Sequence, residues 1–192
     1  QKNLYKYSIF FGKLSLKLRK DFNAMRLLLA SSFEIINLNR NAEQIISNSR
    51  RTNPYFMKFL KMRLSLQDSL KNDNDILEEL KKLLEDYPKN YEIKILLADK
   101  YRSKKLFTES IKLYSQIIDN EPFQNKWSIF YSRGIAFERL NKWEKAESDL
   151  KMAMKLKPDD PYVINYLAYS WLDRKKNIEE ALDLLEKAVE LE

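Results

Sequence analysis

Proline recurs at a regular interval along this chain of 192 residues. Pro54, Pro88 and Pro122 are 34 residues apart, and Pro158 follows 36 residues later. Proline cannot continue the hydrogen-bond ladder of a helix, so it is common just beyond helix ends. A fixed interval of this length indicates a chain built from repeated helical units.

The residues between the prolines repeat as well. The residue 24 positions before each proline is small at Ala30, Ala98 and Gly134 and is Leu64 in the remaining unit, and the last unit repeats the pattern at Ala168. Three positions later stand Phe33, Gln67, Tyr101, Phe137 and Trp171. A small residue stands 12 positions before the proline, a bulky residue 8 positions before it and a second small residue 5 positions before it. In the first full unit these residues are Ala42, Ile46 and Ser49. Small residues let two antiparallel helices approach closely, and the aromatic residue fills the adjacent gap on the same face.

This order of residues resembles the tetratricopeptide repeat family over nearly the whole chain. The resemblance implies an all-α fold, a right-handed α-solenoid of helix hairpins. The match is clearest over 91–122 and 127–158, whereas the unit at 57–88 departs from the pattern at Leu64 and Gln67.

We predict one solenoid over residues 1–192, with residues 1–20 forming the second helix of a truncated unit. The full units are expected at about 21–54, 55–88, 89–122, 123–158 and 159–192. Their first helices are predicted at about 23–37, 55–70, 90–103, 126–140 and 161–174. The second helices are predicted at about 40–50, 74–86, 107–119, 143–156 and 178–190, with one inserted residue near Lys176. Neither end has a polar capping helix, so the parent protein is expected to continue in both directions.

The sequence makes specific predictions about helix caps, one arginine and two aromatic residues. Asparagine and aspartate are expected to cap the free amides at second-helix starts, at Asn39, Asp73, Asn141 and Asn177. Arg133 stands beside Gly134, where the family usually has an apolar residue, so we expect it either against a carboxylate or in solvent. Tyr101 and Phe137 are predicted core aromatics whose truncation to alanine costs roughly 3–5 kcal/mol.

The composition argues against an enzyme. The chain has no cysteine and no histidine, and only two glycines. Thiolate metal sites are therefore excluded, and the commonest general base is missing. No glycine-rich phosphate loop or nucleophile elbow is present. We expect a protein that is not an enzyme and that needs no cofactor or metal ion.

Positive charge is concentrated in the first third of the chain. Residues 1–70 hold 13 Lys and Arg against 4 Asp and Glu, whereas residues 71–192 hold 22 against 24. This basic third could meet an acidic partner, nucleic acid or an anionic surface, or it could simply be a solvated surface. Binding of nucleic acid or an anionic surface is the alternative function, less favoured because the basic residues are scattered over both helices of each unit. No apolar run approaches the roughly 20 residues of a membrane helix, so this segment is not expected to span a membrane.

The family resemblance implies a scaffold or adaptor that binds a protein or peptide in a concave groove lined by the first helices. The predicted partner-binding residues are Lys61, Arg102, Tyr131, Glu138, Tyr162, Asn165 and Tyr169. Tyrosine offers a large contact area at low ordering cost, and an asparagine amide can hold a peptide backbone. These tyrosines could equally serve only to pack adjacent helices. A clamp for a peptide carboxylate is not expected, because Ser65 follows Lys61 and the next helix offers Leu96.

A second resemblance concerns the origin of the chain. Residues 131–139 and 158–174 resemble larger bacterial tetratricopeptide proteins, some of which are envelope adaptors. The resemblance implies a bacterial protein and leaves a cytoplasmic or a periplasmic, envelope-associated location open. End-to-end self-association is a further possibility, since apolar faces at the two ends would cover each other.

Overall fold

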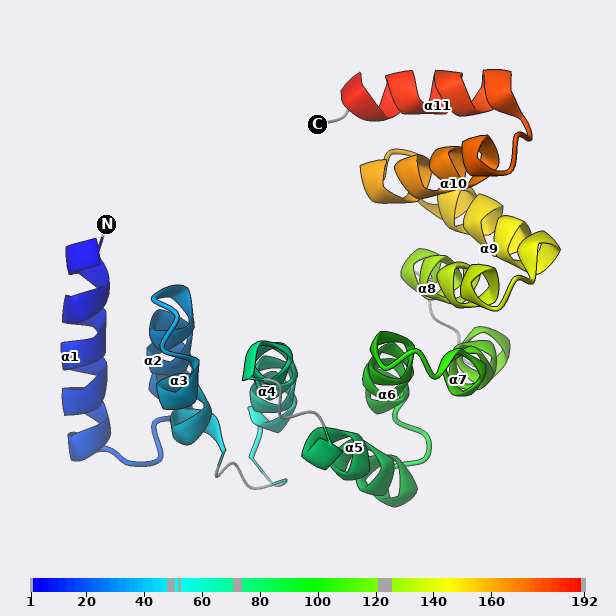
Figure 1. Cartoon of the computed structure of the whole chain (residues 1–192). Coiled ribbons are helices and arrows are strands. Elements are labelled where there is room, and N and C mark those ends of the chain that lie inside the picture. The colour runs from blue at the N-terminus through cyan, green and yellow to red at the C-terminus, as the bar shows by residue number, and fades with distance from the viewer. Residues whose placement is uncertain (1, 48–50, 52, 71–73, 121–125, 191–192) are drawn as a thin grey trace. The chain divides into compact units, whose positions relative to one another are not determined.

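The computed structural model describes residues 2–47, 51, 53–70, 74–120 and 126–190. The described residues form helices joined by short connections, with no β-strand among them (Figure 1). The helices are α1 Lys2–Leu18, α2 Asn23–Ile35, α3 Asn39–Ile46, α4 Phe56–Leu70, α5 Asn74–Asp86, α6 Tyr91–Ser103, α7 Phe107–Asn120, α8 Trp127–Arg139, α9 Trp143–Leu156, α10 Pro161–Asp173 and α11 Ile178–Glu190.

These helices lie where the repeat pattern predicts them. The bounds of α5 are those predicted, and α4 begins one residue later than expected. The third helix ends at Ile46, and the predicted extension to residue 50 enters residues 48–50, which lie outside the described part. The all-helical fold predicted from the sequence is confirmed.

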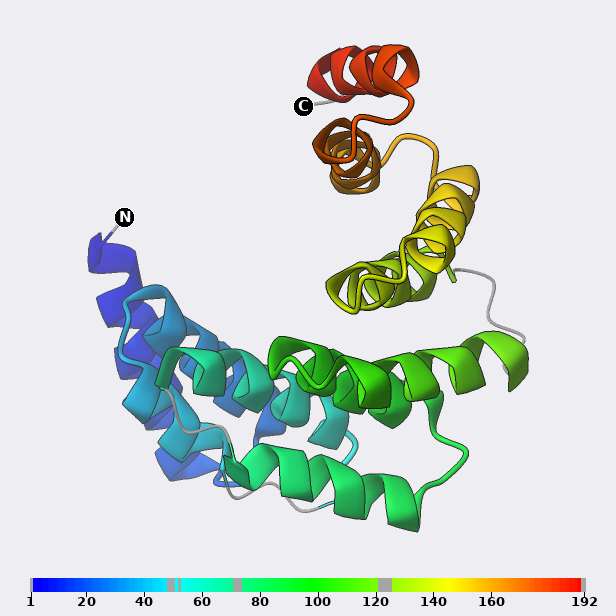
Figure 2. The same cartoon turned by 45° about the vertical axis from the view of Figure 1, so that its right-hand side comes forward.

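The chain divides into two compact units, residues 1–78 and residues 79–192. In the first unit, α1 packs along α2, which forms a hairpin with α3 (Figures 1 and 2). Gly12 permits the close approach of α1, because a Cβ atom there would lie 3.2 Å from Cδ1 of Leu29. The core of this unit consists of Leu29, Ala30, Phe33, Ala42, Ile46, Phe59 and Leu66.

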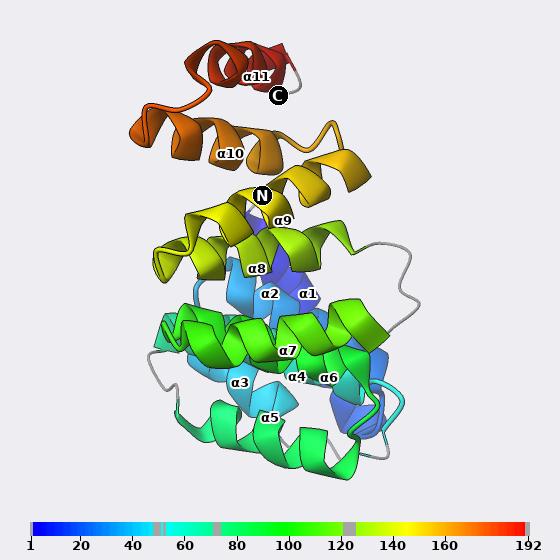
Figure 3. The same cartoon turned by 90° about the vertical axis from the view of Figure 1, so that its right-hand side faces the viewer.

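The second unit contains three hairpins, α6 with α7, α8 with α9 and α10 with α11, which follow one another in chain order (Figure 3). One core cluster joins the α6–α7 hairpin to α8 and consists of Ala98, Tyr114, Ile117 and Ile129. The other joins the α8–α9 hairpin to the α10–α11 hairpin and consists of Trp143, Ala146, Leu150, Leu167, Ala168, Trp171 and Ala181.

Most positions of the repeat pattern are buried, as expected. The small residues Ala30, Ala98 and Ala168 have no exposed surface, and Trp171 is completely buried. Tyr101 and Phe137 are only half-buried, so they are less buried than the core aromatics that the sequence predicted, although Phe137 packs against the cluster that contains Trp143. The side chain of Gln67 lies outside the described part of the structure.

The four hairpin turns that lie wholly within the described residues have the same backbone conformation. Two positions beyond the last residue of α2, α6, α8 and α10 stands a residue with φ between 52° and 62°, namely Asn37, Lys105, Asn141 and Lys175. The residue after the left-handed one donates its N–H to the carbonyl group of the residue five positions earlier, as Leu38 does to Phe33 at 2.9 Å. This arrangement pairs carbonyl groups at the end of a helix that would otherwise lack a partner. A second left-handed residue, Asn177, accompanies the inserted residue predicted in the last turn.

The caps predicted at second-helix starts are wrong where the structure describes them. Asn141 and Asn177 take left-handed turn conformations, which a short asparagine side chain tolerates better than most residues. Asn39 is the first residue of α3, which lacks a side-chain cap, and its Oδ1 is buried without a hydrogen-bond partner among the described groups. Asp73 lies outside the described residues.

Within the described part of the chain, side-chain caps occur instead at the first helices α6 and α10. Asn90 accepts a hydrogen bond from the Ile93 N–H at 3.1 Å, and Asp160 accepts one from the Val163 N–H at 3.2 Å. Each carboxylate or amide oxygen satisfies a free amide at the helix start. These caps fix where α6 and α10 begin, and α10 carries most of the site described next.

Candidate partner-binding site

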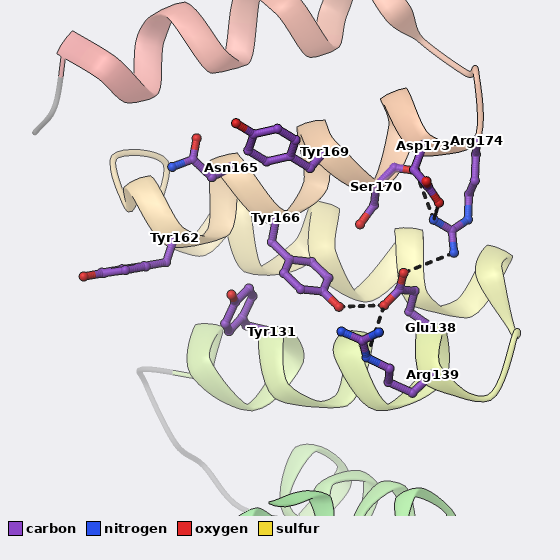
Figure 4. Close-up of a pocket in the computed structure, with 10 residues that line it drawn as sticks. All are labelled: Tyr131, Glu138, Arg139, Tyr162, Asn165, Tyr166, Tyr169, Ser170, Asp173 and Arg174. Atoms are coloured by element: carbon purple, nitrogen blue, oxygen red, sulfur yellow. Dashed lines mark hydrogen bonds and ion pairs between the residues drawn. The ribbon is translucent and has the colours of Figure 1, made fainter. Parts of the chain in front are cut away.

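A cavity of about 410 Å³ lies between α8 and α10, within the second unit (Figure 4). Five of the seven predicted partner-binding residues line it: Tyr131, Glu138, Tyr162, Asn165 and Tyr169. Five further lining residues are Arg139, Tyr166, Ser170, Asp173 and Arg174. The structure therefore brings together most of the side chains that the repeat register selected.

The α10 side of the cavity follows from helical periodicity. Tyr162, Asn165, Tyr166 and Tyr169 lie at spacings of three and four residues, which place them on one face of a helix. The opposite face is buried, with Val163, Ile164, Leu167, Ala168 and Trp171 in the core. The buried face holds the helix rigidly, so the tyrosine face is presented on a fixed element.

Glu138 of α8 links the two helices at the base of the cavity. Tyr166 donates from its hydroxyl to Glu138 Oε2 at 2.6 Å, and Arg174 donates from Nη2 to Oε1 at 3.2 Å. The Arg139 Nε lies 3.9 Å from Oε2. The Arg174 guanidinium also lies 4.2 Å from the centre of the Trp143 ring. Hydrogen bonds of this kind to a charged group are stronger than neutral ones, so Glu138 organises the cavity wall.

Two of the four tyrosines form part of this wall. The Tyr131 and Tyr166 rings meet edge to face, with centres 5.6 Å apart and planes at 83°. Burial raises the pKa of Tyr166 well above its usual range, and the hydrogen bond to Glu138 adds to the increase. Burial also raises the pKa of Tyr131, although the Arg102 charge opposes that increase. Both hydroxyl groups therefore remain neutral hydrogen-bonding groups at physiological pH.

The other two tyrosines extend into solvent. Tyr162 is 74% exposed and Tyr169 is 63% exposed, and Asn165 lies between them along α10 (Figure 4). Exposed aromatic rings of this size beside an asparagine amide provide apolar contact area and hydrogen-bonding groups together.

The remaining two predicted residues lie outside the cavity. Arg102 donates from Nε to the Tyr114 hydroxyl at 3.3 Å and lies 3.9 Å from Asp99, to which Tyr114 donates at 2.6 Å. Burial raises the pKa of both Asp99 and Tyr114. Arg102 therefore belongs to a structural cluster between α6 and α7. Lys61 is exposed on α4 in the first unit.

Sequence reasoning missed several residues of the cavity. Tyr166 follows Tyr162 by four positions and precedes Tyr169 by three, so the same periodicity could have identified it. Arg174 lies beyond the last residue of α10, where helix periodicity gives no direction for a side chain. Its contact with Glu138 depends on the turn before α11 and required the structure.

The basic residues of the first third have local contacts in their own unit. Arg26 donates to the Ile45 carbonyl at 2.6 Å and stacks over Phe59. Arg19 pairs with Asp21, and Lys58 lies over Tyr55. These contacts give several basic side chains a structural role. Separately, none of the described helices is long and apolar enough to cross a membrane.

Comparison with known proteins identifies the fold. No protein-family profile matches the chain, and no curated protein sequence matches it. A solved structure titled as a MamA RS-1 double mutant has a TM-score of 0.68 at 15% identity, covering 89% of this chain and 94% of its own. MamA from residue 41 to its end, from Desulfovibrio magneticus RS-1, gives 0.68 at 13% identity, with 89% and 95% covered. A MamA structure from MSR-1 gives 0.61 at 20% identity, with 84% and 91% covered. MamA is a helical-repeat protein of the tetratricopeptide type, and at these identities the likeness concerns the fold alone. The chain therefore has the tetratricopeptide-type helical-repeat fold.

Proposed function

We propose that this chain is a non-enzymatic scaffold that binds a protein partner through the tyrosine-lined surface of α8 and α10. The observation that carries the proposal is the exposure of Tyr162 and Tyr169 beside a cavity whose wall is fixed by Glu138. Tetratricopeptide-type solenoids serve as interaction scaffolds, which supports the same conclusion by analogy of fold.

Tyrosine is suited to this role because its ring buries much surface while only two torsion angles are immobilised. Large exposed aromatic groups next to a concave surface are enriched among residues that dominate binding energy. The pairing of Tyr131 with Tyr166 and the bonds to Glu138 arrange the cavity before a partner arrives, which lowers the ordering cost of binding.

The charges around the cavity balance. Arg139 and Arg174 face Glu138 and Asp173, and Arg174 lies 3.8 Å from Asp173 as well as bonding to Glu138. A surface of this kind has no net charge to select a strongly acidic or basic ligand. We therefore propose an extended, largely uncharged polypeptide segment as the partner, held by ring contacts and by the Asn165 amide.

The test compares two double variants of the same chain. Tyr162→Ala with Tyr169→Ala removes the exposed rings and leaves Tyr131, Tyr166 and Glu138 in place. Tyr87→Ala with Leu156→Ala removes two exposed apolar groups of the same unit outside the cavity, which are 49% and 46% exposed. Both variants are first checked for equal helical content by circular dichroism.

The expected result is a protein that is captured from native lysate by the wild type and by the control, and lost from the tyrosine variant. Direct titration with the purified partner should then show at least about 30-fold weaker binding, since removal of an interface hot spot costs about 2 kcal/mol or more. Equal affinity of the partner for all three proteins would exclude this surface as its binding site.

A further inference from the structure

The side chains that line the cavity between α8 and α10 are divided by kind along its length. Tyr131 and Tyr162 come from the first two turns of their helices, whereas Arg139 and Asp173 are the last residues of theirs. Figure 4 shows the rings grouped toward the helix starts and the charged groups toward the helix ends. One half of the cavity lining therefore consists of tyrosine rings and the Asn165 amide.

The exposed rings of α10 have a spacing that fits one conformation of a bound chain. Tyr162 and Tyr169 are seven positions apart, so they share one side of the helix and lie about 10.5 Å apart along its axis. A polyproline II helix has three residues per turn, so residues three apart share a side and lie about 9.3 Å apart. A segment in this conformation that runs along α10 brings one side chain to each ring. In a β-strand, side chains on one side recur about every 6.8 Å, which fits the two rings less well.

The hydrogen-bonding groups of the cavity favour the same kind of segment. Both oxygens of Glu138 already accept hydrogen bonds, from Tyr166 at 2.6 Å and from Arg174 at 3.2 Å. The Asn165 amide and the exposed tyrosine hydroxyl groups of α10 can donate to a ligand. A polyproline II backbone has no internal hydrogen bonds, so its carbonyl groups need donors. Proline has no N–H, so a proline-rich segment asks for no acceptor in return.

Resting on the partner-binding role proposed above, we propose that the bound segment is rich in proline and adopts the polyproline II conformation. Its proline rings pack on the exposed faces of Tyr162 and Tyr169, and the Asn165 amide between them donates to a carbonyl group of the segment. Proline is uncharged, which matches the balanced charges at the other end of the cavity. The conformation of such a segment is largely fixed before binding, so less entropy is lost on association.

Other kinds of partner segment fit this surface less well. An α-helix satisfies its backbone groups internally, so the Asn165 amide and the tyrosine hydroxyl groups would gain no backbone carbonyl. The described residues contain no β-strand, so a bound strand would find no sheet edge among them. A strongly charged segment gains little from a lining whose positive and negative groups are paired with each other.

Binding of defined peptides to the purified chain tests this inference. The probe is a fluorescently labelled peptide of four Pro-Pro-Ala triplets, which favours the left-handed polyproline II helix. One control peptide has the same sequence built from D residues, so composition, charge and stiffness are unchanged and only the handedness is reversed. A second control peptide of four Gly-Ser-Ala triplets is flexible. Fluorescence anisotropy measures the dissociation constant of each peptide.

We expect the L peptide to bind at least about 10-fold more tightly than either control peptide. Tyr162→Ala with Tyr169→Ala should weaken its binding at least about 10-fold, whereas Tyr87→Ala with Leu156→Ala should leave it unchanged. Tyr162→Phe with Tyr169→Phe keeps the rings and should lose less affinity than the alanine variant. Asn165→Asp keeps the size of the side chain but removes the amide donor, so it should weaken binding about 10-fold.

Equal binding of the L and D peptides, or binding of the L peptide no tighter than that of the flexible control, would overturn the inference. Unchanged binding to the Tyr162→Ala, Tyr169→Ala variant at wild-type helical content would overturn it as well. A lysate partner lost from that variant, together with no binding of the L peptide, would keep the binding surface and reject the proline-rich segment. Retention of both the lysate partner and the L peptide by that variant would reject both proposals.

Discussion

Arg133 of α8 and Asp149 of α9 form a buried two-point ion pair, with Nε–Oδ2 and Nη2–Oδ1 distances of 2.7 and 2.8 Å. The same guanidinium donates from Nη1 to the Ser115 hydroxyl of α7 at 2.9 Å. Of the two alternatives that the sequence left for Arg133, the structure shows contact with a carboxylate. The pair therefore connects three successive helices.

We expect Arg133→Ala to lower the free energy of unfolding by roughly 3–5 kcal/mol, because Asp149 would remain buried without its partner. Arg19→Ala is the matched control, since its pair with Asp21 is exposed and should be worth less than about 1 kcal/mol. Urea denaturation of the two variants and the wild type measures both values. Similar losses of unfolding free energy in the two variants would contradict the stabilising role given to the pair of Arg133 and Asp149.

Burial predicts that Trp171→Ala is more damaging than Phe137→Ala. Trp171 has no exposed surface and donates to Glu147 at 2.9 Å, so its truncation should cost roughly 3–5 kcal/mol. Phe137 is half-buried, so its loss should be clearly smaller. Thermal and urea unfolding of both variants shows which one is less stable. An equal loss of stability would show that the exposure of the side chain does not determine the cost of its truncation at these two positions.

The stability of the second unit should depend on the ionisation of Glu147. Burial alone would raise its pKa, but hydrogen bonds from Lys151 and Trp171 lower it below the usual value. A lowered pKa stabilises the fold above the unfolded-state pKa, and the contribution disappears as the pH falls through the folded-state pKa. Glu147→Gln should therefore be less stable than the wild type at neutral pH. The difference should begin to shrink as the pH falls below about 4.3, the usual pKa of a glutamate, and disappear as the pH passes through the lower pKa of the folded state.

Denaturation of the two proteins across that pH range provides the measurement. Glutamine keeps an oxygen that can accept from Trp171, so the variant mainly removes the charge. A difference in stability that stays constant down to low pH would mean that the ionisation of Glu147 makes no contribution.

Glycine should stabilise the left-handed turns at Lys105 and Lys175. Their φ angles are 62° and 52°, a region that costs a residue with a Cβ atom roughly 1 kcal/mol or more. Lys105→Gly and Lys175→Gly should therefore each raise the free energy of unfolding, partly offset by the greater freedom of glycine in the unfolded chain. Lys112→Gly, within α7, is the control and should lower it by about 1 kcal/mol. Destabilisation by all three changes would contradict the role given to the turns.

The helices were predictable because the repeat spacing combines many weak signals into one register. Ala30, Ala98 and Ala168 are buried where the pattern requires them, and α5 has the predicted bounds. The bacterial origin, the cellular location and the unit boundaries stay predictions.

The candidate site was predictable only in part, for a physical reason. Helix periodicity selects the residues that share a face, which is why Tyr162, Asn165 and Tyr169 meet Tyr131 at one cavity. It does not say which polar side chains meet across helices, and Arg102 pairs with Tyr114 inside its own hairpin instead. The asparagine caps failed for a related reason, since asparagine favours both helix starts and left-handed turns.

All three tryptophans, Trp127, Trp143 and Trp171, belong to the second compact unit. Intrinsic tryptophan fluorescence therefore reports on residues 79–192 alone, whereas circular dichroism sums the helices of the whole chain. If the two units unfold at different denaturant concentrations, the fluorescence transition will coincide with only one step of the circular dichroism curve. The chain thus carries its own selective optical probe for the half that contains the candidate binding site.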